Sequence, residues 1–226
     1  MSPTTTPDRP RHGLVARLAA GHPAPDDAVA NLRLHLDDHA EDTLARLRAT
    51  LADRADADDL LDVAYRTVDS PYGPLLVAAT RTGLVRVAIE REDHDAVLGE
   101  LAAAVSPRIL RSGRRTDEVA RQLDEYFAGR RQHFEVATDL RLVQGFRRDV
   151  IRHLPFIGYG HTESYAEVAT AAGRPNAVRA VGSACAHNPV PIVVPCHRVV
   201  RSDGTSGQYR GGPEMKAALL AMEAAA

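Results

Sequence analysis

The chain has 226 residues, of which 44% are hydrophobic and 26% are charged, and its formal net charge is −2 at pH 7. These values are ordinary for a globular protein of one large domain or two small ones, and they exclude a disordered, collagenous or coiled-coil chain. No stretch approaches the roughly 18 apolar residues of a membrane span, and the first residues lack the apolar core of a secretory signal. The two cysteines, Cys185 and Cys196, are too few for a disulfide framework or a structural zinc site of sulfur ligands, which favours a reducing cytoplasm.

The negative net charge argues against a nucleic-acid partner until it is divided along the chain. Residues 1–62 hold seven Arg against twelve acidic residues, a balance of −5, whereas residues 145–226 hold nine basic against six acidic residues, a balance of +3. The acidic excess therefore lies in the N-terminal segment, and the C-terminal segment is mildly basic. Lys216 is the only lysine among the 28 basic residues, a bias that we attribute to genome composition.

An amphipathic helix is predicted over residues 26–52, where apolar side chains recur every three or four residues. A second short helix is predicted over residues 58–63. His35 and His39 stand one helical turn apart and could present two imidazoles to a metal ion, but no third ligand accompanies them, and the acidic residues around them are typical of a solvated face. We therefore predict no metal site, and we interpret residues 1–62 as an acidic, helical extension that can serve a protein partner.

Residues 63–143 have the mixed pattern of a small α+β domain. Two β-rich runs, 75–80 and 84–89, flank a glycine-containing turn and predict a hairpin. The other predicted elements are helices over residues 95–105 and 116–127 and a strand over residues 134–136. No catalytic constellation is evident in this domain.

Residues 144–226 are predicted to be mainly helical. A first helix ends near Pro155, and Ser164 with Glu167 forms a capping box that predicts the start of the next helix. After a tight turn, Pro175 opens a third helix, on which Arg179 lies off the apolar face. Two helices joined by a short turn are typical of a DNA-binding helix-turn-helix, but an ordinary helical hairpin has the same pattern.

The most informative segment runs from Asn188 to Val200. Its three prolines forbid a helix and stiffen an extended run, so that Cys196 emerges at the end of an inflexible, apolar segment. A cysteine attacks as the thiolate, and a nearby imidazole lowers its pKa. His197 is adjacent, but an adjacent side chain in an extended run points away, so a water relay or a local turn is needed for it to act as the base. A buried structural cysteine beside an incidental histidine is the commoner meaning of a bare Cys-His pair.

Several motifs in order resemble the O6-alkylguanine-DNA alkyltransferases, the methylated-DNA–protein-cysteine methyltransferases. The family's Pro-Cys-His-Arg-Val-Val signature stands at 195–200. The other matching blocks are Val-Asp-Ser-Pro-Tyr-Gly-Pro-Leu at 68–75, Arg-Ala-Val-Gly at 179–182, Asn-Pro-Val-Pro at 188–191, Gly-Gln-Tyr-Arg-Gly-Gly at 207–212, Lys216 and Glu223. The resemblance covers residues 63–226. It implies an α+β fold, in which a small ribonuclease H-like α/β domain over residues 63–143 precedes a mainly helical domain with a helix-turn-helix over residues 144–226.

The resemblance implies DNA repair by direct reversal. The alkyl group of O6-alkylguanine, or of O4-alkylthymine, would pass irreversibly to Cys196 in a single turnover. His197 would accept the thiol proton through a water, and Glu223 would orient the imidazole. Asn188 would tie the active-site turn together, and Tyr165 would donate a proton toward the leaving base.

The resemblance also assigns contacts to DNA and to the flipped base. Arg179 would fill the space that this base leaves in the duplex, because guanine O6 inside the duplex is out of reach of a buried thiol. The other residues assigned to DNA are Ser164, Ala180 and Arg198. The residues assigned to the substrate pocket are Pro191, Val199, Val200, Gly207, Tyr209, Arg210 and Gly211. Ordinary packing or a flexible turn is the alternative interpretation of these pocket residues.

Two departures from the family limit what is transferred. Arg210 stands where some members carry a serine that hydrogen-bonds O6, and residues 63–144 contain no cysteine for the zinc site of other members. Cys185 lies on an apolar helix face and is interpreted as core.

We therefore predict a suicide methyltransferase that is cytoplasmic and monomeric, needs no cofactor and no membrane, and binds double-stranded DNA containing O6-alkylguanine. The alternatives are a non-catalytic sensor of alkylated DNA that recruits other proteins and, with less support, a cysteine hydrolase.

Overall fold

The structure of the protein is a computed structural model, which describes the backbone of residues 25–225 and the side chains of residue 40 and of residues 42–225. Backbone contacts divide the chain into two compact units, Met1–Leu47 and Arg48–Ala226. All the predicted site residues lie in the second unit.

The first helix, α1 (Pro25–Ala57), confirms the helix predicted over residues 26–52 and extends it. Three leucines of its described part remain exposed, with exposed fractions of 46%, 62% and 60%: Leu44, Leu47 and Leu51. The apolar spacing of this stretch therefore predicts the helix correctly, although these three side chains do not form a buried face.

After α1 the chain makes a turn and continues as the first strand of a sheet. Arg115 forms an ion pair with Asp56 at the end of the helix. The short helix predicted over residues 58–63 is wrong, because Asp59 adopts a left-handed φ of 61° and Val63 is already the first residue of a strand. Aspartate tolerates this conformation better than most residues, which allows the chain to reverse there.

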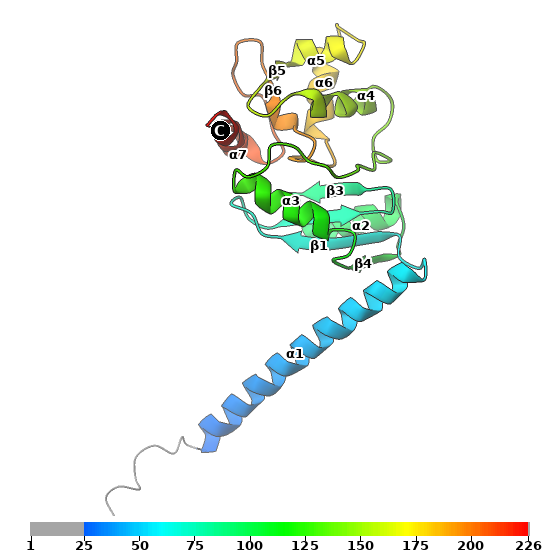
Figure 1. Ribbon diagram of the computed structural model, residues 1–226, viewed down its shortest axis with the longest axis vertical. Coiled ribbons are helices and arrows are strands. Elements are labelled where there is room, and N and C mark those ends of the chain that lie inside the picture. The colour runs from blue at the N-terminus through cyan, green and yellow to red at the C-terminus, as the bar shows by residue number, and fades with distance from the viewer. Residues whose placement is uncertain (1–24, 226) are drawn as a thin grey trace, which may run out of the picture. The chain divides into compact units, whose positions relative to one another are not determined.

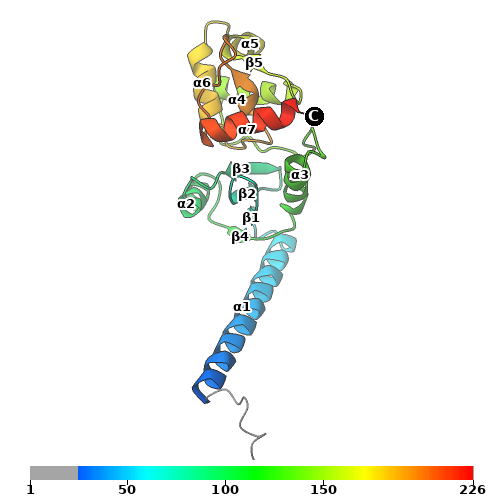
Figure 2. The same ribbon diagram turned by 90° about the vertical axis from the view of Figure 1, so that its left-hand side faces the viewer.

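A four-stranded sheet forms the first part of the second unit. Its strands are β1 (Val63–Val68), β2 (Leu75–Ala79), β3 (Leu84–Ala88) and β4 (Ile109–Arg111). They lie in the order β3-β2-β1-β4, with β1 antiparallel to β2 and parallel to β4. Figure 2 shows the two helices that cover opposite faces of this sheet, α2 (His94–Ala104) and α3 (Asp117–Phe127). Every residue of β2 and β3 is buried because both faces are covered.

The predicted hairpin is formed by β2 and β3, and its turn requires Gly83. This glycine has a φ of 148°, and a side chain there would collide with the backbone of Ala137. The segment after α3 lies against this turn, where the backbone N–H of Leu84 donates to the carbonyl of Ala137 over 2.8 Å. The strand predicted over residues 134–136 is wrong, since the segment makes only an isolated bridge at Thr138.

Gly99 lies inside α2, with open space where a Cβ atom would be. Glycine within a helix costs roughly 0.5–1 kcal/mol relative to alanine, because it loses more backbone entropy on folding. The substitution Gly99→Ala is therefore expected to raise the free energy of unfolding by about 0.5–1 kcal/mol, as measured by urea denaturation. A lower stability would contradict the open surroundings of this position.

The second part of the same unit is mainly helical, so the fold is α+β as expected. Its helices are α4 (Gly145–His153), η1 (Leu154–Phe156), α5 (Tyr165–Ala171), α6 (Val178–Ala186), η2 (Cys196–Arg198) and α7 (Gly212–Ala224). Its two short strands, β5 (Glu163–Ser164) and β6 (Val199–Val200), pair in parallel. Helix α6 packs against both α4 and α5 (Figure 1).

The two helices of the predicted helix-turn-helix are α5 and α6. Ser164 caps α5, because its hydroxyl accepts from the Glu167 N–H over 3.2 Å and the Glu167 carboxylate accepts from the Ser164 N–H over 2.6 Å. The capping box that the sequence predicts is therefore confirmed. Helix α6 buries three residues of its apolar face, which are Val181, Ala184 and Cys185.

The sheet contacts the helical part through strand β3. The backbone N–H of Val87 donates to the carbonyl of Pro189 over 2.8 Å, and the Arg86 guanidinium reaches the same carbonyl over 3.4 Å. The carboxylate of Glu92 pairs with both Arg86 and Arg210. The sheet therefore supports the proline-rich segment at Pro189, the residue that follows Asn188.

Candidate functional site

Cys196 lies in the interior of the helical part, where the proline-rich segment ends in the 3-10 turn η2. The residue is 2% exposed. Asn188 fixes it, because the side-chain amide of Asn188 donates to the carbonyl of Val194 over 2.8 Å and to the Cys196 Sγ over 3.2 Å. Burial raises the pKa of the Cys196 thiol, and the hydrogen bond from Asn188 opposes that rise. The resting residue is therefore a thiol that needs a base before it can attack.

His197 is fully buried beside it in the same turn. Its Nε2 lies 2.9 Å from Oε1 of Glu223. Because a carboxylate only accepts, Nε2 carries the proton, and Nδ1 keeps a lone pair with no hydrogen-bond partner among the described residues. The pKa of His197 is lowered, chiefly by burial, and the hydrogen bond and charge of Glu223 oppose that shift. The imidazole is therefore neutral near pH 7 and can take up a proton at Nδ1.

Helix α7 carries Glu223, whose carboxylate is the electrostatic centre of the site. Arg198 donates to both of its oxygens over 2.8 and 2.9 Å. Burial tends to raise the pKa of Glu223, but the hydrogen bonds from His197 and Arg198 outweigh burial and hold that pKa at about 2. The ionised carboxylate can therefore stabilise the imidazolium that forms when His197 accepts a proton.

Tyr126 is a site residue that the sequence did not reveal. It is buried on α3, in the sheet-containing part, and its hydroxyl donates to Oε1 of Glu223 over 2.5 Å. In the sequence it is only one aromatic residue on the apolar face of a helix, 97 positions before its partner. No local motif signals this contact.

Arg198, which the resemblance assigns to DNA, is buried in the structure. Its side chain is 5% exposed, and its guanidinium donates to Glu223 and, over 2.6 Å, to the carbonyl of Ile157. A buried guanidinium whose donors are taken up in this way cannot reach a phosphate. Arg198 instead balances the charge of Glu223 within the site.

Tyr165 and Gly207 approach each other closely. Tyr165 is the first residue of α5 and is half-buried. A Cβ atom at Gly207 would overlap the Tyr165 hydroxyl and lie 2.8 Å from its Cζ. Burial raises the pKa of Tyr165 to about 12, so the phenol keeps its proton at neutral pH and can donate it.

Two of the seven predicted pocket residues, Arg210 and Gly211, are half-buried. The other five are buried: Pro191, Val199, Val200, Gly207 and Tyr209. The Tyr209 ring meets the His197 ring edge-on at 6.2 Å, and its buried hydroxyl has no partner among the described residues. Gly211 is packed closely between Tyr209 and Met215. The Tyr209 ring therefore lies beside the His197 imidazole.

Lys216 is fully buried behind β6. Its Nζ donates to the carbonyl of Val199 over 2.5 Å. Burial lowers the pKa of Lys216. Cys185 is itself buried in the core, as expected from its helix face.

Arg210, which the resemblance assigns to the substrate pocket, contacts two other parts of the protein. The Arg210 guanidinium forms an ion pair with Glu92 and donates twice to the carbonyl of Ala186, over 3.2 Å in each case. The free carbonyl at the C-terminus of α6 and the carboxylate beyond it attract the positive charge. Arg210 therefore joins the sheet-containing part to the segment beside Tyr209.

The remaining residues assigned to DNA belong to the helix-turn-helix and differ in exposure. Arg179 is exposed on α6, next to the half-buried Ala180, and Ser164 is half-buried at the start of α5. This arrangement gives the helix pair one exposed basic side chain at the N-terminus of its second helix.

No group of three or more metal-binding side chains occurs among the residues whose side chains are described. The pair His35 and His39 lies outside those residues. Within the described range, no helix is long and apolar enough to cross a membrane.

Comparisons with known proteins cover both parts of the second unit. The family described as "6-O-methylguanine DNA methyltransferase, ribonuclease-like domain" matches residues 63–140, and "6-O-methylguanine DNA methyltransferase, DNA binding domain" matches residues 145–225. A methylated-DNA–protein-cysteine methyltransferase of Mycolicibacterium paratuberculosis is 40% identical over 71% of this chain and 92% of that protein. A protein of the same name from Methanosarcina barkeri is 36% identical over 70% of this chain and 96% of its own length.

Solved structures agree with this match. The O6-methylguanine methyltransferase of Mycobacterium tuberculosis is similar with a TM-score of 0.61 and 37% identity, covering 72% of this chain and 93% of that one. The OGT of the same organism in complex with DNA has a TM-score of 0.61 and 36% identity over the same shares. The chain therefore belongs to the 6-O-methylguanine DNA methyltransferase family.

Proposed function

We propose that the protein repairs DNA by direct reversal, taking the alkyl group from O6-alkylguanine onto Cys196. The observation that carries this proposal is a buried thiol, held by Asn188 and followed in one turn by a neutral His197 that is bound to an ionised Glu223. This is the combination of a nucleophile, a base and an orienting carboxylate that activates a cysteine.

In the proposed reaction, the Cys196 proton passes through a water to Nδ1 of His197, and Glu223 stabilises the imidazolium. The thiolate then attacks the alkyl carbon in line with the bond to O6. A carbon–sulfur bond forms, the carbon–oxygen bond breaks, and its electron pair goes to the guanine. Tyr165 donates a proton to the departing guanine, which leaves as a neutral base. The product is a thioether at Cys196, so each molecule reacts once, and this transfer needs no cofactor.

The two parts of the second unit would have different roles in this reaction. Residues 144–226 would bind double-stranded DNA through α5 and α6, with Arg179 replacing the flipped base in the stack. Residues 63–143 would support the site, because Tyr126 and the β3 contact to Pro189 both come from that part. For residues 1–62 we propose a protein-binding role, and for the whole protein a location in the cytoplasm with access to chromosomal DNA.

The proposal is tested by measuring whether the methyl group is transferred stoichiometrically to the protein. The protein is incubated with duplex DNA containing O6-methylguanine, digested, and mapped by mass spectrometry. We expect one methyl group per molecule on the peptide that holds Cys196, and none in Cys196→Ala. The matched control is Cys185→Ala, whose core cysteine should leave the modification in place. Multiple turnover would refute the proposal, and binding without transfer would favour the alternative of a lesion sensor.

The rate of transfer is expected to be insensitive to mild acid. The pKa of His197 is lowered by burial, and the base is neutral only above that pKa. The single-turnover rate should therefore stay level from pH 8 down to about 6.5, the ordinary pKa of histidine, and fall only at lower pH. Quenched single-turnover reactions over this range measure it. A rate already halved near pH 6.5 would contradict the lowered pKa.

A further inference from the structure

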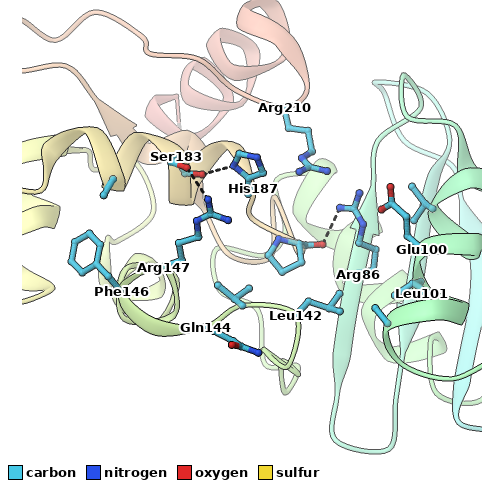
Figure 3. A pocket seen from close by; sticks show the side chains of 15 residues that line it. Arg86, Glu100, Leu101, Leu142, Gln144, Phe146, Arg147, Ser183, His187 and Arg210 are labelled. Carbon is cyan, nitrogen blue, oxygen red and sulfur yellow. Dashed lines mark hydrogen bonds between the residues drawn. The ribbon is translucent and has the colours of Figure 1, made fainter.

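We infer that Arg147 and Ser183 form a site for a backbone phosphate of bound DNA, in a cleft beside the second helix of the helix-turn-helix. The inference rests on the proposed function and extends the predicted DNA contacts from α6 to α4. The cleft has a volume of about 720 Å³ and lies between α4 and α6 on one side and α2 and β3 on the other (Figure 3).

The wall formed by α4 and α6 offers hydrogen-bond donors to an anion. Arg147, in the first turn of α4, is exposed and donates from Nη2 to the hydroxyl of Ser183 over 3.3 Å. In the part of the chain whose side chains are described, Arg147 pairs with no carboxylate, so its charge is not neutralised. The Ser183 hydroxyl keeps its own proton to donate. One phosphate group can therefore accept from the guanidinium and the hydroxyl together.

His187 completes this wall on the same helix. Its Nδ1–H donates to the carbonyl of Ser183 over 2.8 Å, which fixes the imidazole next to the serine (Figure 3). An imidazole side chain adds no negative charge to the wall. The wall therefore carries one uncompensated positive charge and no acidic side chain.

The opposite wall explains where in the cleft the phosphate can bind. Glu100 on α2 repels an anion, and Leu101 beside it is apolar. Arg86 and Arg210 also line the cleft, but both already pair with Glu92. The free positive charge is thus confined to the side formed by α4 and α6.

The position of this wall on α6 points to DNA rather than to a free anion. Arg179, Ser183 and His187 follow one another at four-residue spacing, so they share one face of the helix. If Arg179 enters the duplex, the DNA strand that crosses α6 must also pass Ser183, which lies one helical turn further along the same face. Phosphate contacts of this kind fix the register of a protein on DNA without reading sequence.

The salt dependence of DNA binding tests the inference. Affinities of the wild-type protein and of Arg147→Ala are measured by fluorescence anisotropy between 50 and 200 mM salt, on the same duplex with and without O6-methylguanine. Loss of one phosphate contact should reduce the slope of log K against log salt by about 0.9, so that the weakening over this range is about threefold smaller in the variant. The matched control is Arg152→Ala, an exposed arginine of α4 that does not line the cleft, and it should keep the wild-type slope.

A second measurement locates the contact. Duplexes with one neutral methylphosphonate at successive positions are bound by both proteins. One position should weaken binding of the wild type and leave Arg147→Ala unaffected, with Ser183→Ala intermediate. An unchanged slope in Arg147→Ala, or no position with this difference, would overturn the inference. Alkyl transfer by the wild type on the lesion duplex is recorded alongside: its absence would refute the proposed function, whereas transfer with unchanged slopes would refute only the phosphate site.

Discussion

Replacing Glu223 by glutamine is expected to destabilise the protein by about 3–5 kcal/mol and to slow alkyl transfer by about 10²–10⁴-fold. Glu223 is 2% exposed and balances the charge of the buried Arg198. The amide cannot do so, and its NH₂ group would face a donor. His197 would also lose the anion that stabilises its protonated form. Urea unfolding measures the first effect, and single-turnover transfer by the folded protein measures the second.

The pH dependence of the stability shows whether the charge of Glu223 or its shape is responsible for the stabilisation. Its pKa of about 2 lies below the ordinary value for glutamate, near 4.3. The stabilisation by the ionised group is therefore complete above about pH 4.3 and is lost as the pH falls toward 2. The difference in stability between wild type and Glu223→Gln should be largest at pH 7 and should shrink in acid. A difference that is independent of pH would refute the role assigned to the charge.

Two further variants serve as controls for Glu223. Glu118→Gln changes a carboxylate that is 55% exposed and pairs with Arg121 on the surface, so stability and transfer should both stay unchanged. Tyr126→Phe removes one donor to Glu223 and keeps the charge pair with Arg198. Its expected cost is about 1 kcal/mol, with most of the transfer rate retained.

The second large effect is expected from Gly207→Ala, which should slow transfer by about 10²-fold or more. The added methyl group would overlap the Tyr165 hydroxyl, so either this hydroxyl or the Gly207 backbone must move. Either movement changes how the Gly207 backbone and the phenol are placed relative to each other, and we propose that this phenol donates to the leaving base. The cost in stability should be about 1–3 kcal/mol, because a neighbouring side chain is forced out of its place.

The comparison with Tyr165→Phe shows whether the hydroxyl is the cause. If proton donation matters, Tyr165→Phe should slow transfer about as much as Gly207→Ala does, while keeping nearly the wild-type stability. Gly99→Ala is the matched glycine control, since open space surrounds that position. Full transfer activity in Gly207→Ala would refute the role of Tyr165.

The sequence predicts those parts of the fold that depend on local patterns. Ser164 and Glu167 predict the start of α5 because a capping box uses only neighbouring atoms. Apolar periodicity predicts α2, α3, α4 and α6 for the same reason. The strand predicted over residues 134–136 fails because strand formation depends on a distant partner, and that segment meets the sheet only at Thr138. The helix predicted over 58–63 fails because Val63 is drawn into β1.

The site shows the same division between local and distant contacts. Asn188, Cys196 and His197 lie within ten residues of one another, so a single sequence motif is enough to identify them. Arg198 and Arg210 look equally suited to bind DNA or substrate in the sequence, because their carboxylate partners are far away along the chain. The contact of Arg210 with Glu92 spans 118 positions. Only the folded chain shows that both charges are already neutralised.

Lys216 has a practical consequence for chemical labelling. It is the only lysine of the chain, and it is enclosed between α7 and β6 with its amine bound to the carbonyl of Val199. An N-hydroxysuccinimide ester therefore meets no accessible ε-amino group on the folded protein. Acylation of this one amine requires α7 to separate from β6, so its time course, followed by mass spectrometry, reports how often the region around Cys196 opens.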